Sequence, residues 1–397
     1  MAMNATELQK IQNWLIDGAG LAASPPEMLA QACERFVQAG LPLWRVGVFI
    51  RTLHPEIFGR NFIWKPGEEV EVGTVDFHFQ QSPQFTQSPL RIVFQQGIEL
   101  RGRMSDPDSR RFPFFDDMRA EGVTDYIAIP LVFLDGSINA SSWTTKRPGG
   151  FSDDEIAMMR AIVTPLARIS EIVTLRRTAT MLLDTYVGNR AGERILGGQI
   201  RRGHADTMNA AIWLSDLRGF TALSDRLPPE TMVDILNLYF DCQVAAIRDR
   251  GGEVLKYMGD GLLAVFPIDE YVDDARQVCG QVLDAARESR AGVAALEYAT
   301  GEAVEHFRFG VALHVGPVLY GNIGGGNRLD FTCIGPAVNL AARLEKIAGR
   351  LGHTVVASEG FAGICREGWS DLGEFPIAGF SRAQRVYGLA DETPPHG

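Results

Sequence analysis

The chain has 397 residues, of which 46% are hydrophobic and 22% charged, and its formal net charge is −11. This composition is typical of a packed globular protein of two or three domains and argues against a disordered chain. The acidic balance argues against nucleic-acid binding, which needs a basic surface. No apolar run is long enough to span a bilayer.

The cysteines also bear on the class of protein. Five are present, they are far apart, and none forms a Cys-x-x-Cys pair. Neither a zinc site nor a disulfide framework is therefore predicted. The N-terminus lacks a basic segment followed by an apolar core, so no signal peptide is predicted. We expect a protein of the reducing cytoplasm.

The first region, residues 1–154, is predicted to be an α/β domain. Apolar residues recur at helical spacing in residues 5–16 and in Met28–Ala39. Asp135-Gly136 predicts a hairpin turn between two strands. Strand-like runs follow the helices at Arg45–Leu53, Arg91–Phe94, Tyr126–Leu134 and Ser137–Thr144.

Residues 155–204 are predicted to form a signalling helix and a connector. Ser152 and Glu155 make a capping box at its start. A long amphipathic helix either pairs as a parallel coiled coil in a dimer or packs on its own domain. The dimer is favoured because the second apolar stripe continues beyond the globular region. The first stripe is Ile162, Leu166, Ile169 and Val173, and the second is Ile172, Leu175, Ala179, Leu182 and Tyr186. Glycines between residues 188 and 203 predict a turn-rich connector.

The third region, residues 205–392, alternates strands and helices. Their succession predicts an α+β fold of the ferredoxin-like β-α-β-β-α-β order, followed by a smaller set of strands. The predicted strands are Ala210–Leu214, Glu253–Met258, Leu262–Phe266, Phe307–Val315, one ending at Thr332, Thr354–Ala357 and Gln384–Leu389, and the helices are Pro229–Arg250, Val272–Arg290 and Ala337–Ile347.

Two aspartates stand where strands end. Asp216 follows an apolar strand and precedes a glycine-containing turn, whose backbone N–H groups can face an anion. Asp260 lies in Met-Gly-Asp-Gly, which predicts a tight hairpin between two apolar strands. Two such carboxylates can hold divalent ions that stabilise an in-line displacement at phosphorus. Each aspartate alone is ordinary turn chemistry, so the pair is what points to a metal site.

Three segments together resemble the signature blocks of class III adenylate cyclases. They are Ser-Asp-Leu-Arg-Gly-Phe-Thr at 215–221, Lys-Tyr-Met-Gly-Asp-Gly at 256–261, and Phe-Thr-Cys-Ile-Gly-Pro-Ala-Val-Asn-Leu-Ala-Ala-Arg-Leu-Glu at 331–345. The resemblance spans nearly half of the chain, with the blocks in the family's order and spacing. It implies conversion of ATP to 3′,5′-cyclic AMP and pyrophosphate with two Mg²⁺ or Mn²⁺ ions per site.

The resemblance also implies a role for each site residue. Asp216 and Asp260 match the metal aspartates, with Leu217 in the same site. Asn339 and Arg343 match the catalytic pair that orients the ribose and stabilises the transition state, and they share a helix face. The residues expected to bind substrate are Lys256 and Thr332 at the purine and Gly219, Phe220 and Thr221 in the turn. The family builds each site from both subunits of a dimer, which implies a homodimer.

The choice of nucleotide depends mainly on Lys256. A guanylate-specific site in this family usually has Glu there, so ATP is favoured. The hydroxyl of Thr332 can donate or accept, and it discriminates weakly. The alternatives are a guanylate cyclase and a catalytically weak cyclase-fold regulatory module. The presence of both aspartates, Asn339 and Arg343 argues against the latter.

The residues expected to bind the triphosphate depart from the family pattern. Pro317 and Ala378 stand where basic residues are often found. Arg382 or Arg385 could substitute, although both have the character of surface charges. This departure predicts slower turnover or a higher metal requirement.

The first region resembles a GAF sensor domain, less specifically. The resemblance rests on residues 126–137, Trp-Thr-Thr at 143–145 and Gly-Gly-Phe-Ser-Asp-Asp-Glu-Ile at 149–156, with a PAS-like domain as the competing label. It implies an unknown small-molecule or protein signal. His54, His78 and Cys33 are weak candidates for ligand contacts, because isolated residues of these kinds are usually structural or exposed.

Overall fold

The computed structural model describes residues 5–19, 24–269, 274–300, 303–326, 328–366 and 368–392. The chain forms two compact units, Met1–Leu182 and Leu183–Gly397. All five cysteines are free thiols. Within the described ranges, no helix is both long and apolar enough to cross a membrane.

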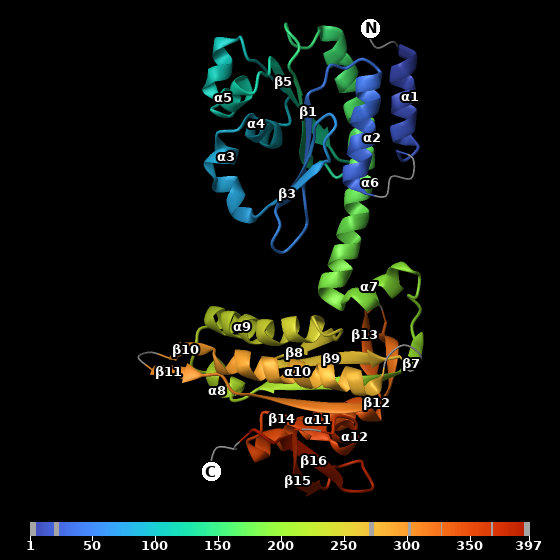
Figure 1. Cartoon of the computed structure of the whole chain (residues 1–397), viewed down its shortest axis with the longest axis vertical. Helices are drawn as coiled ribbons and strands as arrows, with labels where there is room; N and C mark the ends of the chain where they lie inside the picture. The colour runs from blue at the N-terminus through green and yellow to red at the C-terminus, as the bar shows by residue number, and fades with distance from the viewer. Residues whose placement is uncertain are drawn as a thin grey trace. The chain divides into compact units, whose positions relative to one another are not determined.

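The first unit is built on a six-stranded antiparallel sheet of order β3-β2-β1-β6-β5-β4. Helices α1, α2 and α6 cover one face, and α3, α4 and α5 lie on the other side (Figure 1). The bounds are α1 Ala5–Ile16, α2 Pro25–Gln38, β1 Arg45–Arg51, β2 Gly59–Trp64, β3 Glu71–Val75, α3 Pro83–Thr86, α4 Pro89–Gln96, β4 Leu100–Arg103, α5 Phe114–Ala120, β5 Asp125–Val132, β6 Ile138–Thr145 and α6 Asp153–Val187. Two short 3-10 helices cover Phe77–Gln81 and Pro107–Arg111.

One predicted strand of this unit is wrong. Residues Arg91–Phe94 belong to helix α4, not to a strand. Ser88 accepts a hydrogen bond from the Leu90 N–H at the start of the helix, Pro89 occupies its first turn, and Gly97 ends it with φ 66°. These are strong start and stop signals for a helix. They outweigh the β-branched pair within a segment only two turns long.

Helix α6 starts at the predicted capping box. The Ser152 N–H donates to Glu155, and the Glu155 N–H donates to the Ser152 hydroxyl. Pro165 lies inside this helix and lacks the N–H that would bond to Ala161. The Gln12 side chain from α1 donates to the Ala161 carbonyl at 3.0 Å, so the proline leaves no orphaned acceptor there.

The two apolar stripes of α6 have different environments. Ile162, Leu166 and Ile169 are buried against the sheet. In the second stripe Ile172, Leu175 and Tyr186 are 63%, 69% and 75% exposed. These three apolar side chains of α6 are therefore exposed among the described residues.

The second unit contains an eight-stranded sheet. Along it the order is β15-β16-β14-β12-β7-β9-β8, and β13 pairs with β12. The elements β7, α9, β8, β9, α10 and β12 follow one another as strand, helix, strand, strand, helix and strand, as the sequence predicts. The bounds are α7 Asn189–Leu196, β7 Ala205–Leu217, α8 Phe220–Ser224, α9 Pro229–Arg248, β8 Glu253–Met258, β9 Gly261–Ile268, α10 Ala275–Ala294, β10 Glu297–Thr300, β11 Ala303–His306, β12 Phe309–Gly325, β13 Arg328–Ile334, α11 Pro336–Leu351, β14 Val355–Ser358, α12 Glu359–Ile364, β15 Trp369–Phe375 and β16 Gln384–Leu389.

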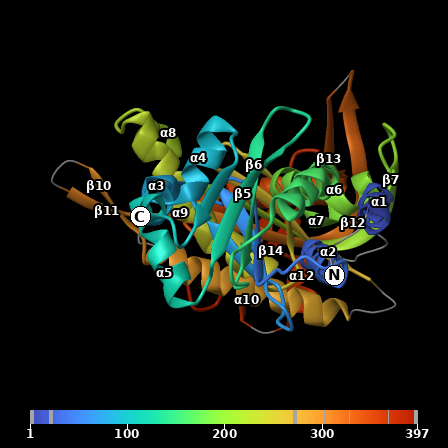
Figure 2. The ribbon, with the colours of Figure 1, turned by 90° about the horizontal axis from the view of Figure 1, so that it is seen from above.

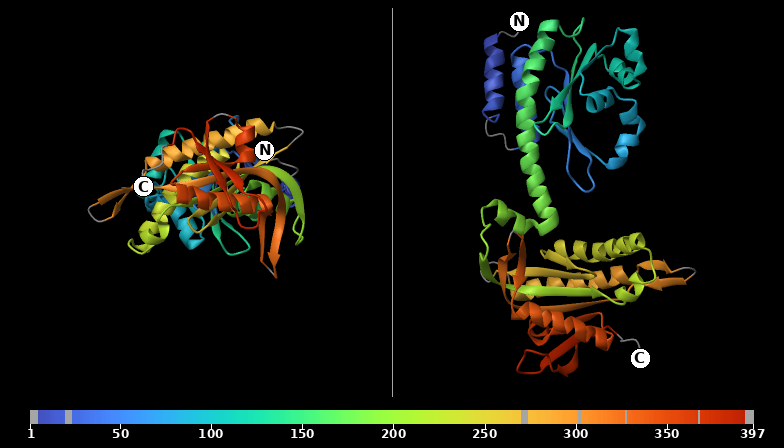
Figure 3. Two further views of the ribbon diagram at one scale, coloured as in Figure 1. Left: turned by 90° about the horizontal axis from the view of Figure 1, so that it is seen from below. Right: turned by 180° about the vertical axis from the view of Figure 1, so that it is seen from behind.

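The two faces of this sheet carry different helices. Helices α9 and α10 pack on one face, and α11 packs on the other (Figure 3). The paired ends of β12 and β13 extend beyond the rest of the sheet, and the β10–β11 hairpin projects separately (Figure 2). Strand β12 is much longer than predicted, because it continues past Val315 to pair with β13. The predicted start of α10, Val272, lies outside the described residues.

The predicted turn-rich connector is wrong in part, because helix α7 occupies its first half. Ala191 of α7 is fully buried in the second unit's core. Arg194 of α7 pairs with Asp206 and lies over the ring of Tyr320. Tertiary contacts of this kind stabilise a short helix despite its glycines.

Candidate active site

The two predicted metal aspartates lie next to each other. Asp216 is near the end of β7 and pairs with Gly261, the first residue of β9. Asp260 immediately precedes Gly261 in the β8–β9 turn, where Gly259 has a φ of 68°. The two carboxyl groups are close enough to share a hydrogen bond when one is protonated. The strand register thus brings together residues that are 44 positions apart.

This pair is electrostatically strained without a cation. Burial is the largest cause that raises the pKa of Asp216 to about 7, followed by the charges of Asp260 and Glu345. No group of three or more potential metal-ligating side chains occurs among the described residues. Two carboxylates nevertheless suffice for Mg²⁺, which commonly takes one or two with phosphate oxygens. The pair therefore fits a divalent ion that arrives with a nucleotide.

A buried ion pair supports the end of β7. Arg218 pairs with Glu345 of α11 at 2.9 Å, and the Glu345 side chain is only 6% exposed. The guanidinium lies between Gly310 of β12 and Gly349 of α11, where any added Cβ would overlap it. Both residues stand inside the quoted sequence blocks, but we predicted no role for them. The one available signal was an acidic residue on the apolar face of a predicted helix.

The turn after Asp216 contains the predicted phosphate-facing residues. Leu217 ends β7 and is buried, so its side chain is not free to reach a ligand. Gly219 has a φ of 75°, which favours glycine, and it precedes α8. No side chain caps α8, whose first residues are Phe220 and the exposed Thr221. The structure thus places these residues in the turn and short helix that directly follow Asp216 and Leu217.

The two predicted purine contacts lie on β8, which pairs with β9, and on β13, which pairs with β12. Lys256 is half-buried in β8 after a register shift, and its charge acts on the Cys333 thiol of β13. Thr332 precedes Cys333 and is 5% exposed. Its hydroxyl has no hydrogen-bond partner among the described residues. A buried polar group without a partner is unfavourable, and a ligand that supplies one relieves this cost.

Asn339 and Arg343 lie one turn apart on α11. The Arg343 guanidinium extends toward the turn at Gly379, where an added Cβ would come into van der Waals contact with it. No carboxylate within the described ranges pairs with Arg343. Positions 343 and 345 are about 200° apart around a helix, so Arg343 faces away from the Glu345 side that lies toward Asp216.

The departures from the family pattern have clear positions. Pro317 is exposed in β12, between the stretch paired with β14 and the stretch paired with β13. Ala378 is exposed in the turn next to Gly379. Arg385 pairs with Glu374 at 3.1 Å, with Asp371 also nearby at 3.8 Å. Arg385 thus already has two carboxylate partners. Arg382 is the exposed cation of the preceding loop.

The candidate contacts in the first unit lie in different surroundings. Cys33 is fully buried in the core, where burial raises the pKa of its thiol well above the usual value. His78 is exposed on a 3-10 helix. His54 lines a cavity together with residues of α2, β1, β2 and α6.

Comparison with known proteins identifies the second unit. Residues 204–361 match the model of the adenylate and guanylate cyclase catalytic domain. The chain therefore carries a class III nucleotidyl cyclase catalytic domain.

Two curated relatives and one solved structure that resemble this chain are named as adenylate or adenylyl cyclases. The chain is 31% identical over 169 residues to an adenylate cyclase of Anabaena cylindrica, a match that covers 40% of this chain and 31% of that protein. It is 29% identical over 177 residues to adenylate cyclase 1 of Rhizobium meliloti, covering 44% of this chain and 26% of that protein. The adenylyl cyclase CyaB from P. aeruginosa aligns at 24% identity and a TM-score of 0.40, covering 49% of this chain and all of that one. The chain spans less than a third of these curated relatives' length.

Proposed function

We propose that this protein is an adenylate cyclase that converts ATP to 3′,5′-cyclic AMP and pyrophosphate. The observation that carries the proposal is the adjacent pair Asp216 and Asp260 on a domain of the cyclase family. The half-buried Lys256 and the unpartnered hydroxyl of Thr332 favour adenine. The named curated relatives reported above are adenylate cyclases, which supports the same choice.

In the proposed reaction the ribose 3′-hydroxyl gives up its proton to solvent as its oxygen attacks the α-phosphorus. The bond from that phosphorus to the oxygen bridging to the β-phosphate breaks, and pyrophosphate leaves with the electron pair. Asp216 and Asp260 would hold Mg²⁺ or Mn²⁺, which supplies positive charge to the attacking and leaving oxygens. Asn339 orients the ribose. Arg343 donates hydrogen bonds from its planar guanidinium to the phosphoryl oxygens, where negative charge builds up in the transition state.

We propose that the site forms between two copies of the chain. Within one copy, Arg343 faces away from the Glu345 side of α11 that lies toward Asp216. A second copy related by a two-fold axis would supply Lys256, Thr332, Asn339 and Arg343 to the aspartates of the first. An isologous interface then makes two equivalent sites.

Product formation from ATP and from GTP, each with Mg²⁺ and with Mn²⁺, tests the proposal. We expect cyclic AMP from ATP to dominate. Asp260→Ala should abolish product without changing the dimer, whereas Asp249→Ala, a matched change at an exposed helix end, should leave activity intact. Dominant cyclic GTP would support a guanylate cyclase. Activity that survives Asp260→Ala would contradict the metal assignment, and no product from either nucleotide would support a cyclase-fold regulatory module.

We further propose that the first unit is a GAF-like sensor in a cytoplasmic protein. Its antiparallel sheet with helices on both faces supports a small sensor domain. Helix α6 continues beyond the end of this unit to Val187. It therefore connects the proposed sensor to the catalytic domain along the chain and would carry the signal between them. A GAF-deleted chain with unchanged basal activity and unchanged response to cell extracts would contradict the sensor role.

A further inference from the structure

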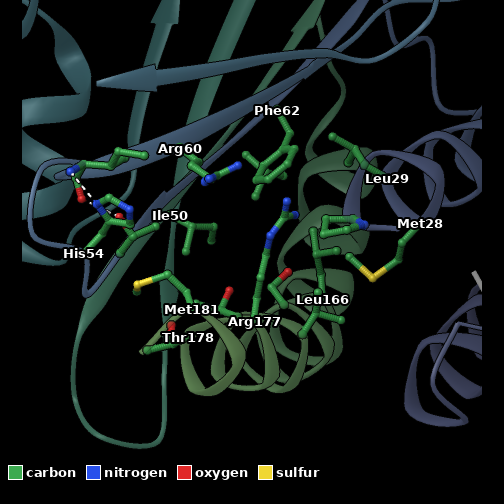
Figure 4. A pocket seen from close by; sticks show the side chains of 17 residues that line it. Met28, Leu29, Ile50, His54, Arg60, Phe62, Leu166, Arg177, Thr178 and Met181 are labelled. Carbon is green, nitrogen blue, oxygen red and sulfur yellow. Dashed lines mark hydrogen bonds between the residues drawn. The ribbon is translucent and has the colours of Figure 1, made fainter. Parts of the chain in front are cut away.

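The first unit contains a partly open cavity of about 810 Å³, including the part open to solvent. It lies between β1 and β2 on one side and α2 and α6 on the other (Figure 4). The lining residues are Pro25, Met28, Leu29, Val48, Ile50, Thr52, His54, Ile57, Arg60, Phe62, Leu166, Ser170, Val173, Thr174, Arg177, Thr178 and Met181.

Two arginines face each other across this space. Arg60 of β2 and Arg177 of α6 point toward one another in Figure 4. Burial, and then the charge of Arg177, lowers the pKa of Arg60. Among the described residues neither arginine has a carboxylate partner, and none of the lining residues is acidic. Two facing guanidinium groups without a counter-ion repel each other, and an anion placed between them removes that cost.

Further hydrogen-bonding groups in the cavity are available. Ser170 is 5% exposed, and its buried hydroxyl has no hydrogen-bond partner among the described residues. The His54 Nδ1 accepts from the N–H groups of Glu56 and Ile57. In neutral His54 the proton must therefore sit on Nε2, which can donate to a ligand. The site thus offers donors for an anionic head.

Apart from three threonines, the rest of the cavity wall is apolar. Met28, Leu29, Ile50, Phe62, Leu166 and Met181 contribute most of it (Figure 4). Such a wall favours a hydrocarbon body over a free inorganic ion, because burial of apolar surface contributes about 25 cal/mol per Å².

We propose that this cavity binds a small amphipathic organic anion, with a carboxylate or phosphate head between Arg60 and Arg177 and an apolar body against Phe62, Leu166 and Met28. The wall on α6 extends from Leu166 to Met181, close to the end of the first unit. Occupancy of the cavity therefore fixes the side chains of the helix that continues toward the catalytic domain.

Isothermal titration of the full-length protein without nucleotide tests this assignment. The probes are hexanoate, octanoate, decanoate and octyl phosphate, with octanol, octylammonium and inorganic phosphate as comparisons. We expect at least one of the organic anions to bind about tenfold or more tightly than octanol. Their relative affinities identify which head the site prefers. Equal binding of octanol, preferential binding of octylammonium, or no binding of any organic anion would overturn the proposal.

Matched arginine variants localise the binding. Arg60→Gln and Arg177→Gln should each weaken binding of the best anion about tenfold, whereas Arg176→Gln, on the same helix but outside the cavity, should change it less than about twofold. Unchanged thermal unfolding shows that the variants fold. If Arg177→Gln and Arg176→Gln behave alike, the site is elsewhere and the proposal fails. Because cyclase activity is not measured, failure here is distinguishable from failure of the proposed reaction.

Discussion

At the scale of single residues, Arg218 fills a space that two glycines leave open. Glycines 310 and 349 leave the space that its guanidinium fills, and Glu345 is its buried partner. Sequence reasoning found Asp216 and Asp260 because a strand end and a hairpin have local signatures. It did not find the Arg218–Glu345 pair, because that contact depends on how α11 packs against the sheet.

The pair supports a prediction on stability. Arg218→Met should destabilise the protein by about 3–5 kcal/mol, because it leaves Glu345 buried and unpaired. Adding Glu345→Leu should recover most of that loss, since an apolar pair of similar size costs no desolvation. Denaturant unfolding of both variants measures this. A double variant as unstable as Arg218→Met alone would contradict the electrostatic account.

The Asp216 carboxyl predicts a pH dependence. Its pKa is near 4 in an unfolded chain and about 7 in the folded, metal-free protein. Between these values the folded state binds more protons, so stability should fall as the pH rises from about 4 to about 7. Asp216→Asn should flatten this dependence in EDTA. Thermal unfolding from pH 5 to 8 should show it, and a wild-type Tm independent of pH would refute the prediction.

The purine contacts predict a change in selectivity. Lys256→Glu should lower the ratio of kcat/KM for ATP over GTP by about 10²-fold, because a carboxylate repels the acceptor nitrogens of adenine and accepts from guanine. Rates with the two nucleotides at low concentration measure the ratio. Thr332→Val, which removes a hydroxyl but keeps the volume, serves as the milder comparison.

At the scale of elements, capping and periodicity predicted the longer helices of both units and most strands of the second unit, whereas the short helices α3, α4, α5, α7, α8 and α12 were missed. The capping box gave the start of α6, and Ser88, Pro89 and Gly97 could have given α4 its correct type. Strands β2, β3, β4, β10, β11 and β15 were not predicted, because short strands are stabilised mainly by their pairing partners, which the local sequence does not show.

Helix α6 carries a prediction of its own. Leu175 is 69% exposed although it belongs to an apolar stripe, so Leu175→Gln should weaken self-association of the chain about tenfold or more if that stripe packs in a dimer. Sedimentation equilibrium would detect this, with Arg176→Gln as the matched control. Equal dimer affinities would indicate that α6 takes no part in the dimer.

At the scale of the whole molecule, a shared site has a consequence that no single chain shows. Asp260→Ala and Arg343→Ala should each be inactive alone, but their mixture should recover up to about a quarter of wild-type activity. Half of the dimers are then mixed, and each mixed dimer keeps one intact site. An assay after co-expression tests this. No recovery would place both residues in a site within one subunit.

The proline of α6 gives the first helix of the chain a mechanical role. The Gln12 side chain donates to the Ala161 carbonyl, which Pro165 leaves without its helical donor. Helix α1 thereby supports the 35-residue helix α6 at the position where one of its backbone hydrogen bonds is missing. We expect a helix supported in this way to transmit a rotation or a displacement along its axis instead of bending at Pro165. Gln12→Leu would remove this hydrogen bond but keep the packing volume. We expect faster amide hydrogen exchange in α6 on either side of residue 165, because the helix opens there more readily.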